Sequence, residues 1–550
     1  MRWVVCCAIG LFGIGLSGNL VADEDALAAA TLTARKVAEK YLEQEGGEGA
    51  EFRSLYVDKL GQAHARYDQT YGGVPVFAGQ VIVHVGLSEE KVIGVTDARR
   101  PVGPINIKPS IRAVTAERIV KRSEGLRGQL RATTNLVIYV TEGGSNLAWQ
   151  VNLVGLDRDR LPVDWIALVD ARDGSVLLSY NNVQSKQDDP PGSGDDDDPP
   201  GPGNDDDPPG SGDDDDPPGP GHDGDGDTGT TPAIGEADTL YFGTVGLATE
   251  AYEDGTFGMR DPTRGGNYTT DMLDMRTGDG ELFIDGDNLW GDFTNLDRAT
   301  AGTDAHFSAS VAWDYYLNVH GRRGIYDDGK GILSRVHYGR DYVNAFWSSS
   351  CQCVTYGDGD GVIADPLVSI DIVAHEMTHG VTAATAALIY NGESGGLNES
   401  MSDIFATAAE FYAAGVSNTV GDYWCGEDVW TPGVAGDALR YMDDPTRDGR
   451  SIDHYDDYTA NMDVHYSSGL TNHVFYLMSE GGPHASTGEL VTGIGRDKAE
   501  QVFYRALAAY MTPDTDFAGA KEATKKAAMD LYGSDTAELV AQAWTACGVE

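Results

Sequence analysis

The sequence has few basic residues for its length. Its 550 residues include 39 Lys and Arg against 87 Asp and Glu, which gives a formal net charge of −48 at pH 7. Binding to nucleic acid or to an anionic membrane surface requires clustered Lys and Arg. We therefore expect neither partner. An acidic surface is typical of solubility, salt tolerance or calcium binding, and the charge alone does not separate these.

Long hydrophobic runs are also scarce. One run covers residues 3–22, follows a single Arg2 and is followed at once by three acids. A short basic start, an apolar stretch and small residues before the acids predict a secretory signal over residues 1–22. The alternative is an uncleaved membrane anchor. Because the sequence has no second run of this kind, we expect a soluble protein that is secreted to the extracellular space.

Cysteine is rare. Two of the six cysteines, Cys6 and Cys7, would leave with the signal. The spacing of the others does not suit a paired C-x-x-C zinc site. In an oxidising compartment four cysteines allow three pairings, and sequence does not choose among them. These four are Cys351, Cys353, Cys425 and Cys547.

Apolar residues make up 41% of the chain, which is enough for real cores, and the length suggests two or three domains. Residues 23–185 predict a first α+β unit. A helical pattern covers residues 28–42, alternating strands cover 80–85 and 165–169, and Gly-rich pairs at 72–73 and 173–174 mark turns.

A repeat separates this unit from the rest of the chain. DDPPGSGDD and DDPPGPGND-like units of nine residues occur four times from Asp188. Residues 187–227 contain 16 Asp and no Lys, Arg or Glu. Like charges repel and Pro favours extended backbone, so we interpret residues 186–232 as a stiff, solvated linker. Calcium binding at Asp223, Asp225 and Asp227 is a weaker alternative, because the Gly and Glu of a helix-loop-helix calcium motif are absent.

The second folded region begins at about residue 233. Its first half mixes short strands with Asp/Gly loops, and helical patterns cover residues near 370–384, 396–413, 467–480, 495–510 and 516–531. His375-Glu-Met-Thr-His379 is an H-E-x-x-H motif. On a helix these two histidines share a face, so both imidazoles can reach one zinc ion with Glu376 beside its open position.

A third ligand is needed to complete such a site. Glu399 and Asp403 lie 20 and 24 residues past His379, at helical i, i+4 spacing. One of them can bind the metal while the other accepts the free N–H of a ligand histidine. This pairing makes an accidental motif or a merely solvated acidic face a poor explanation.

At this point the chain resembles the thermolysin family of secreted zinc metalloproteases, including its vibriolysin and pseudolysin branch. The resemblance covers about residues 240–550 and rests on NAFW from Asn344, YGDGDG from Tyr356, DIVAHEMTHGVT from Asp371, LIYNGESGGLNESMSDIF from Leu388 and DVHYSSG from Asp463. It implies an α+β fold in two lobes, a β-rich lobe at 233–380 with the zinc-binding helix and a mainly helical lobe at 381–550. Residues 23–185 resemble the α+β propeptide of these proteases, with a stable accessory domain as the alternative.

The resemblance also implies roles for particular residues. Zinc ligands are His375, His379 and Glu399; Glu376 is the general base; His465, oriented by Asp463, and Tyr390 serve the developing oxyanion; Asp403 and Asn398 support the zinc histidines; Asn344, Ala345 and Arg440 bind the substrate backbone; Leu367, Ile372, Val429 and Leu439 line an apolar pocket. We therefore expect cleavage before bulky hydrophobic residues.

Calcium is a further implication of the resemblance, with one to four ions. The interior positions are Asp371, Glu410, Asp422, Trp424 and Glu427, and possible outer positions are Asp285 with Asp287 and Thr431 with Asp437. Two departures from the family concern specificity. The chain has two more residues than thermolysin between Trp347 and Tyr356, and Cys425 replaces an aliphatic residue near the pocket.

We therefore expect a monomeric, secreted zymogen that hydrolyses proteins and peptides, with its own propeptide as intramolecular inhibitor and chaperone. In one variant of this reading the acidic tether keeps the propeptide attached after the cut. The rival reading from a different class is a non-enzymatic, calcium-dependent adhesion or matrix protein on a protease fold. The complete set of catalytic positions disfavours it.

Overall fold

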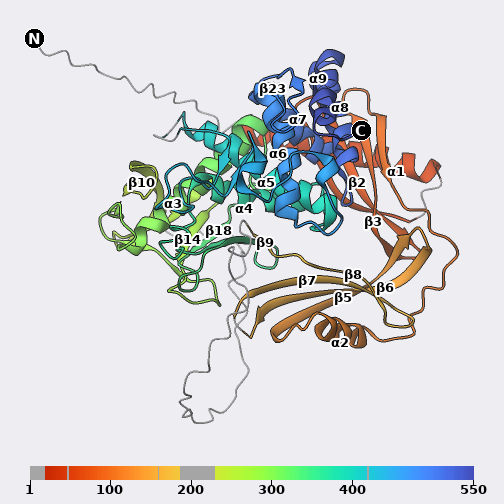
Figure 1. Ribbon diagram of the computed structural model, residues 1–550, viewed down its shortest axis with the longest axis horizontal. Helices are drawn as coiled ribbons and strands as arrows, with labels where there is room; N and C mark the ends of the chain where they lie inside the picture. Colours follow the sequence, from red (N-terminus) through yellow and green to blue (C-terminus); the bar gives the residue numbers. More distant parts are fainter. Residues whose placement is uncertain (1–18, 46–48, 159, 186–229, 416, 418–419) are drawn as a thin grey trace, which may run out of the picture.

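A computed structural model describes residues 19–45, 49–158, 160–185, 230–415, 417 and 420–550. Most of the predicted signal and residues 186–229 of the predicted linker lie outside these described residues. Within them, none of the helices combines the length and the apolar character needed to cross a membrane. The described chain forms two parts that lie against each other (Figure 1). We call residues 19–185 the propeptide part and residues 230–550, which form two lobes, the peptidase part, after the predictions made from the sequence.

The propeptide part is built on a sheet of eight strands in the order β1-β2-β3-β5-β6-β7-β8, with β4 paired to β3. Alternating apolar side chains explain why these strands form. Val81, Val83 and Val85 of β3 all point into one core, where they meet Ala34 and Ala38 of helix α1. Helix α2 covers the strands of the second half in the same way. The elements are α1 (Asn19–Gln44), β1 (Ala50–Val57), β2 (Gln62–Tyr71), β3 (Val74–Gly86), β4 (Lys91–Ala98), α2 (Ala113–Ser123), β5 (Gly128–Thr141), β6 (Gly144–Asp157), β7 (Pro162–Asp170), β8 (Val176–Asn181) and β9 (Gln184–Ser185).

The first lobe of the peptidase contains two sheets. One has the order β16-β12-β11-β10-β17, and the other has the order β13-β14-β18-β20-β19-β9, with β15 paired to β14. The elements are β10 (Thr231–Asp238), β11 (Thr244–Ala251), β12 (Phe257–Gly258), β13 (Arg260–Asp261), β14 (Asn267–Asp271), β15 (Glu281–Leu282), β16 (Ile284–Asp285), β17 (Leu289–Trp290), α3 (Arg298–Tyr315), the π-helical segment η2 (Tyr316–His320), β18 (Leu333–Val336), β19 (Ala345–Ser348) and β20 (Cys353–Tyr356).

Helix α3 was not expected from the sequence, which predicted only short strands and loops in this part. Its residues are buried on nearly every side, from Thr300 to Trp313. A helix that is buried all round has no polar face, so the amphipathic period that identifies surface helices is missing. The Asp297 side chain caps its first turn by accepting a hydrogen bond from Ala299 N–H.

The second lobe is helical, as the sequence predicts, and shares one large core with the first. The predicted helix at 370–384 has the observed bounds, and the other four predicted helices are present with small shifts at their ends; α9 was not predicted. Helix α4 (Ile370–Ala384) crosses the predicted boundary between the lobes, and the elements that follow it are α5 (Gly392–Ala413), β21 (Trp424–Cys425), β22 (Arg440–Tyr441), α6 (Val464–Glu480), β23 (Gly482–Pro483), β24 (Leu490–Val491), α7 (Arg496–Arg505), the π-helical segment η5 (Ala506–Tyr510), α8 (Phe517–Tyr532) and α9 (Ser534–Ala546).

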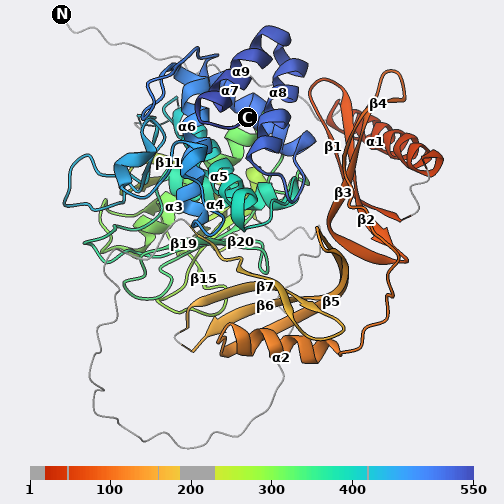
Figure 2. The same ribbon diagram turned by 45° about the vertical axis from the view of Figure 1, so that its right-hand side comes forward.

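The propeptide part contacts the peptidase part on two sides. Figure 2 shows α1 with β1–β4 beside the C-terminal helices, and α2 with β5–β7 below the first lobe. Helices α4 and α5 lie at the centre of the peptidase part (Figure 1). Strand β9 leaves the propeptide sheet and becomes the edge strand of a peptidase sheet, next to β19.

Candidate active site

Helix α4 brings His375 and His379 together at the centre of the molecule. Their Nε2 atoms are 3.1 Å apart, and neither side chain is exposed. Apolar neighbours bury the helix on both sides of the motif. Gly380 allows its close approach to strand β19, since a Cβ there would lie 3.0 Å from the ring of Trp347. The buried helix therefore aims two ring nitrogens at one point.

The second ring nitrogen of each histidine is already committed. His375 Nδ1 lies 2.8 Å from Asp403 Oδ1, and His379 Nδ1 lies 2.8 Å from Asn398 Oδ1. Ser402 Oγ also lies 3.1 Å from His379 Nδ1. An imidazole that donates from Nδ1 and is neutral carries its lone pair on Nε2, which is the form that binds a metal.

Glu399 completes the cluster from helix α5. Its Oε2 is 3.4 Å from His375 Nε2 and its Oε1 is 3.4 Å from His379 Nε2. The ligand atoms of these three residues lie within 4.8 Å of one another, and all three side chains are fully buried. Among the described residues, Glu399 Oε2 has ion-pair contacts, such as that with His375, but accepts no hydrogen bond. Two imidazoles and one carboxylate around one point match the donor set of a catalytic zinc site.

The electrostatics of the cluster fit a cation. Burial lowers the pKa of His379 to about 3, so its imidazole is neutral. Burial also lowers the pKa of His375, but Asp403 and Glu399 outweigh burial and raise it, so a metal and a proton compete for this Nε2. The two Nε2 atoms, 3.1 Å apart, are close enough for one cation to contact both of them.

Glu376 lies on the same helix, beside the cluster. Its Oε2 accepts a hydrogen bond from the Trp347 backbone N–H at 2.9 Å, and the side chain is fully buried. This bond ties the carboxylate to β19, the strand that contains Ala345 and follows Asn344. A carboxylate held next to a metal-binding cluster and an edge strand is placed to exchange protons with a bound peptide.

His465, Tyr390 and Asp463 form the opposite wall. Asp463 Oδ1 caps helix α6 by accepting from His465 N–H at 3.0 Å, and lies 2.7 Å from His465 Nδ1. The Tyr390 hydroxyl donates to Glu399 Oε1 and lies 3.2 Å from His465 Nε2. Burial raises the pKa of Tyr390 well above its ordinary value, which keeps the hydroxyl protonated as a donor. The Tyr390 hydroxyl and the Nε2 atom of His465 therefore lie together beside the cluster.

Arg440 contacts the metal cluster through Asp403. Its Nε and Nη2 donate to the two carboxylate oxygens of Asp403 at 2.8 and 2.9 Å. Asn472 Nδ2 also donates to Asp403 Oδ2 at 2.8 Å. Sequence reasoning missed Asn472, although it lies seven residues past His465, on the same face of helix α6. Asp403 is thus held from two other elements, β22 and α6, while it holds His375.

The predicted pocket residues lie in the core near these groups. Leu367, Ile372 and Val429 are buried in the shared core, and Leu439 is half-buried. A Cβ on Gly426 would lie 3.2 Å from Leu439 Cβ and 3.9 Å from Ile372 Cδ1, so these residues surround one place. Their role as a side-chain pocket stays a prediction.

A cleft of about 750 Å³ opens in front of the site. It is lined by Asn344, Tyr390 and His465 of the peptidase and by Tyr180 and Val183 of the propeptide. The strand that follows, β9, runs antiparallel to β19, with Ser185 opposite Phe346 and Gln184 opposite Trp347. The propeptide therefore covers the strand that the sequence predicts to pair with an extended substrate.

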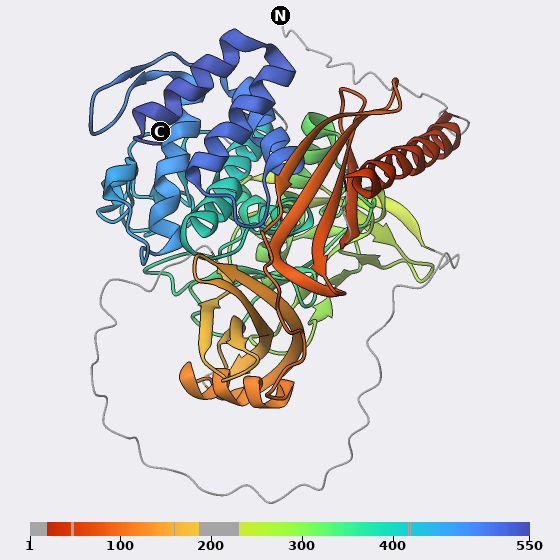
Figure 3. The same ribbon diagram turned by 90° about the vertical axis from the view of Figure 1, so that its right-hand side faces the viewer.

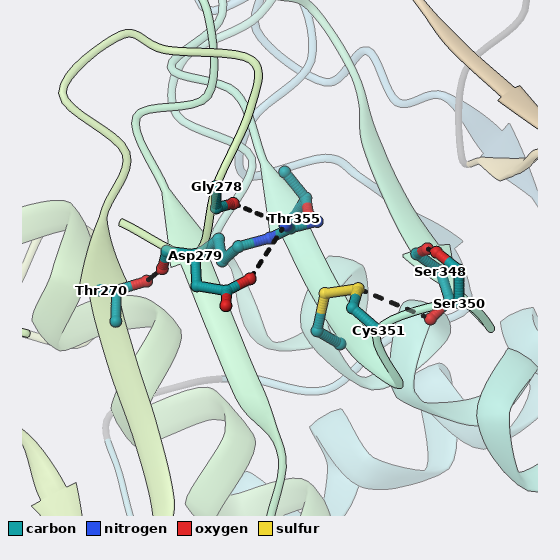
Figure 4. The surroundings of a disulfide bond; sticks show 9 residues. Thr270, Gly278, Asp279, Ser348, Ser350, Cys351 and Thr355 are labelled. Atoms are coloured by element: carbon teal, nitrogen blue, oxygen red, sulfur yellow. Dashed lines mark hydrogen bonds and ion pairs between the residues drawn. A yellow bond between two sulfur atoms is a disulfide. The ribbon is translucent and has the colours of Figure 1, made fainter. Parts of the chain in front are cut away.

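A disulfide lies at the end of the same strand. Cys351 is bonded to Cys353 in the turn between β19 and β20, and Cys351 Sγ lies 3.8 Å from Ser348 O (Figure 4). This pairing is one of the three that the sequence left open. Cys425 and Cys547, which the same pairing scheme would join, are buried and lie outside this disulfide. The segment between Trp347 and Tyr356, which the sequence predicts to be two residues longer than in thermolysin, thus contains a covalently closed turn.

A second acidic cluster lies between α5 and the following loop. Oxygens of Glu410, Asp422 and Glu427 lie within 4.8 Å of one another, and the Trp424 backbone N–H donates to Asp422 Oδ1. Burial and neighbouring carboxylates, Asp371 among them, raise the pKa of both Glu410 and Glu427. Several buried carboxylates facing each other match the oxygen ligands that calcium requires.

The outer calcium candidates are arranged differently. Asp285 Oδ2 accepts from the N–H groups of Asp287 and Asn288, and Thr431 Oγ1 donates to Asp437 Oδ2 at 2.8 Å. In the described part of the chain, neither place is among the groups of three or more possible His, Cys, Asp or Glu ligands. Calcium at these two places stays a prediction.

A third such group, which the sequence did not indicate, is made of Asp453, His473 and His484. His473 Nδ1 lies 2.9 Å from Met442 O while its Nε2 accepts from Ala485 N–H. His484 Nε2 lies 3.0 Å from Asp453 O, and its Nδ1 accepts from backbone N–H groups. Every ring nitrogen is used, so these histidines serve the fold.

Comparisons with known proteins identify the family of the chain. The model of the thermolysin metallopeptidase catalytic domain matches residues 234–383, that of the alpha-helical domain matches residues 386–549, and the fungalysin/thermolysin propeptide motif matches residues 50–95. Thermolysin of Alicyclobacillus acidocaldarius subsp. acidocaldarius is 38% identical over 97% of this chain and 92% of its own length. The transglutaminase-activating metalloprotease of Streptomyces mobaraensis is 39% identical over 90% of this chain, which spans 60% of that protein.

Among solved structures, the precursor of protealysin, a metalloproteinase from Serratia proteamaculans, is 30% identical over 52% of this chain and 87% of its own, with a TM-score of 0.43. The two peptidase matches and the propeptide match occur in the order that the sequence predicts. The chain therefore belongs to the thermolysin family of zinc metalloendopeptidases and contains the propeptide motif of that family, as expected of a zymogen.

Proposed function

We propose that Glu376 is the general base of this peptidase, with zinc held by His375, His379 and Glu399. The observation that carries the proposal is the buried Glu376 carboxylate, fixed by Trp347 N–H beside the cluster of those three residues. When bound, zinc supplies Lewis acidity toward a peptide carbonyl and lowers the pKa of a water molecule.

Glu376 takes the proton of the attacking water at its carboxylate and passes it to the leaving amine. His465 and Tyr390 donate hydrogen bonds to the oxygen that becomes negative, and one such donor is typically worth about 3 kcal/mol. Asp463 holds the His465 ring, and Asp403 and Asn398 hold the rings of His375 and His379. Asn344, Ala345 and Arg440 bind the peptide backbone on either side of the cut.

We propose that the preferred cleavage lies before a bulky hydrophobic residue such as Leu or Phe. The support is the apolar character of Leu367, Ile372, Val429 and Leu439 around Gly426. Profiling of the mature enzyme with a peptide library tests this. Enrichment of Leu and Phe after the cut supports the assignment, and enrichment of charged residues there contradicts it.

We propose that the propeptide, residues 23–185, inhibits the peptidase until it is removed. The support is strand β9, which occupies the edge of β19 where an extended substrate would pair. The cut is expected to be autocatalytic, in or after the linker at 186–232. Amino-terminal sequencing of the mature protein locates it, and a mature protein that still begins before β9 contradicts the proposal.

We further propose that the Glu410, Asp422 and Glu427 cluster, with Asp371 and Trp424, holds structural calcium. The total number of ions is one to four, depending on the outer places. We also propose that the first 22 residues direct export and that the mature enzyme acts as a monomer outside the cell. Removal of this segment during export, seen by amino-terminal sequencing of the exported precursor, tests the assignment.

The activity as a whole is tested by casein hydrolysis by the mature protein with and without a chelator. Hydrolysis that stops with the chelator and returns with zinc supports the proposal. A folded protein that binds calcium and cleaves neither casein nor peptides would instead fit the adhesion or matrix reading.

A further inference from the structure

The propeptide contacts the peptidase at a second place, far along the chain from β9. The hairpin of β1 and β2 lies against the C-terminal helices, as Figure 3 shows from the propeptide side. Here Arg66 of β2 is buried, with 2% of its surface exposed. A buried cation is costly unless its donors are satisfied, so its partners identify what this hairpin is built to bind.

The partners of Arg66 are backbone carbonyls of the peptidase. Its Nη2 donates to Ala508 O at 2.8 Å and Leu507 O at 3.2 Å, and its Nη1 donates to Met511 O at 2.8 Å. One further bond, from Nη1 to Gln80 Oε1, stays within the propeptide. Three acceptors from one turn of backbone form a socket that matches the planar fork of a guanidinium.

The socket is the C-terminal end of a helix. Segment η5 continues helix α7 and ends at Tyr510, so carbonyls of its last turn have no partner within the helix. The helix dipole adds partial negative charge at this end. Burial lowers the pKa of Arg66 to about 9, which still leaves the guanidinium charged at neutral pH. The positive guanidinium and the partial negative charge of the helix end therefore attract each other. The hydrogen bonds of Arg66 given above go to carbonyl oxygens and not to a carboxylate.

The same hairpin contacts the other lobe. Lys59, in the turn between β1 and β2, donates to Val319 O at 2.7 Å, in segment η2 at the end of helix α3. Asp58, next to it, pairs with Arg505 of the second lobe, and both side chains are about 5% exposed or less. The hairpin thus places one cation at the end of a helix of each lobe.

The two helix ends also meet beneath the hairpin. His320 of η2 stacks on Tyr504 of α7 with ring centres 4.1 Å apart, and Tyr315 OH donates to Glu500 at 3.0 Å. Tyr56 of the hairpin lies edge-on to Tyr504 at 6.3 Å. The contact between the lobes on this side is therefore covered by the propeptide.

We propose that the β1–β2 hairpin is the template that docks the two lobes during folding, and that the carbonyls of Leu507, Ala508 and Met511 form a guanidinium-binding socket for Arg66. This inference rests on the proposed role of residues 23–185 as propeptide and divides that role in two. The hairpin assembles the peptidase, and β9 inhibits it.

The test is refolding of the full-length precursor from denaturant, followed by casein hydrolysis after maturation. Arg66→Met removes the guanidinium and keeps an apolar stem. We expect its yield of active peptidase to fall at least about tenfold, since a set of buried hydrogen bonds to a charged group is lost. Arg131→Met, which changes an exposed arginine on β5 of the same propeptide, is the matched control and is expected to refold like the parent.

Hydrogen exchange on the uncut Glu376→Gln precursor separates docking from damage to the propeptide itself. We expect Arg66→Met to lose protection at the end of η5 while β2 and β3 keep theirs. Parental refolding yield, or lost protection confined to β2 and β3, overturns the inference. Failure of the proposed function looks different: the unchanged precursor itself would yield no active peptidase, while the exchange pattern would still report on the socket.

Discussion

The backbone N–H of Trp347 donates to Glu376 Oε2 at 2.9 Å, which joins the strand beside the cleft to the carboxylate beside the metal ligands. One hydrogen bond thus fixes the distance between the place where a peptide pairs and the group that we propose to move its protons. The same strand carries β9 of the propeptide on its outer edge. Inhibition and catalysis therefore depend on one strand.

Glu376→Ala is expected to leave zinc binding intact and to abolish processing of the precursor. Its carboxylate is the proposed base and is not one of the three metal ligands, so kcat is expected to fall by at least about 10³. Metal analysis and peptide hydrolysis check this, with Glu538→Gln on the exposed side of α9 as the control. Efficient hydrolysis by the Ala variant would defeat the mechanism.

Asp403→Asn is expected to weaken zinc binding by about 10- to 100-fold, because Asp403 orients the His375 ring. It also leaves the buried Arg440 guanidinium without its carboxylate, which costs about 3–5 kcal/mol of folding stability. The double variant Asp403→Asn, Arg440→Met is expected to regain part of that stability but not the zinc affinity. Chelator competition and thermal unfolding measure the two effects separately, and parallel recovery of both contradicts the assignment.

The effect of Glu427→Gln on thermal stability is expected to change sign when calcium is added. Without calcium, removal of one of several facing carboxylates relieves repulsion, so the variant should unfold at a higher temperature than the parent. With calcium in excess the parent should be the more stable protein, because it keeps the ligand. Glu522→Gln, exposed on α8, should follow the parent under both conditions. Curves that never cross would argue against calcium at this cluster.

Acid is expected to lower the stability of the precursor. Burial, with help from neighbouring cations that include Lys526 and Arg66, lowers the pKa of His84 to about 2, and His64 Nδ1 lies 2.7 Å from its Nδ1. Folding keeps this histidine neutral. The free energy of unfolding is therefore unaffected by the histidine above its ordinary pKa of 6.5, and it falls progressively as the pH drops below that value. Asp58 and Arg505 face His64 and do not reverse the direction of this pH dependence, because the pKa of His64 is lowered as well.

Thermal unfolding of the uncut Glu376→Gln precursor between about pH 8 and about pH 5 measures this effect. The parent should lose stability on acidification, and His84→Gln should lose less of it. An equally steep decline in both proteins would assign the acid sensitivity to other groups.

The sequence predicts the zinc cluster well, because H-E-x-x-H and the later Glu399 and Asp403 express helical spacing directly. Helix α4 has the predicted bounds for the same reason. Helix α3 was missed because complete burial removes the period on which such predictions depend. Two contacts join residues far apart in the chain: the strand pairing of Gln184 with Trp347, and the hydrogen bond from Arg66 to Met511 O. No local sequence pattern encodes such contacts.

The most direct test of the account is the zinc content of the purified mature peptidase, measured together with its activity. The account predicts one zinc per chain, loss of hydrolysis on chelation with return on adding zinc, and loss of both zinc and hydrolysis in His379→Ala. Full hydrolysis by protein that contains no zinc, or unchanged zinc content in His379→Ala, would contradict it.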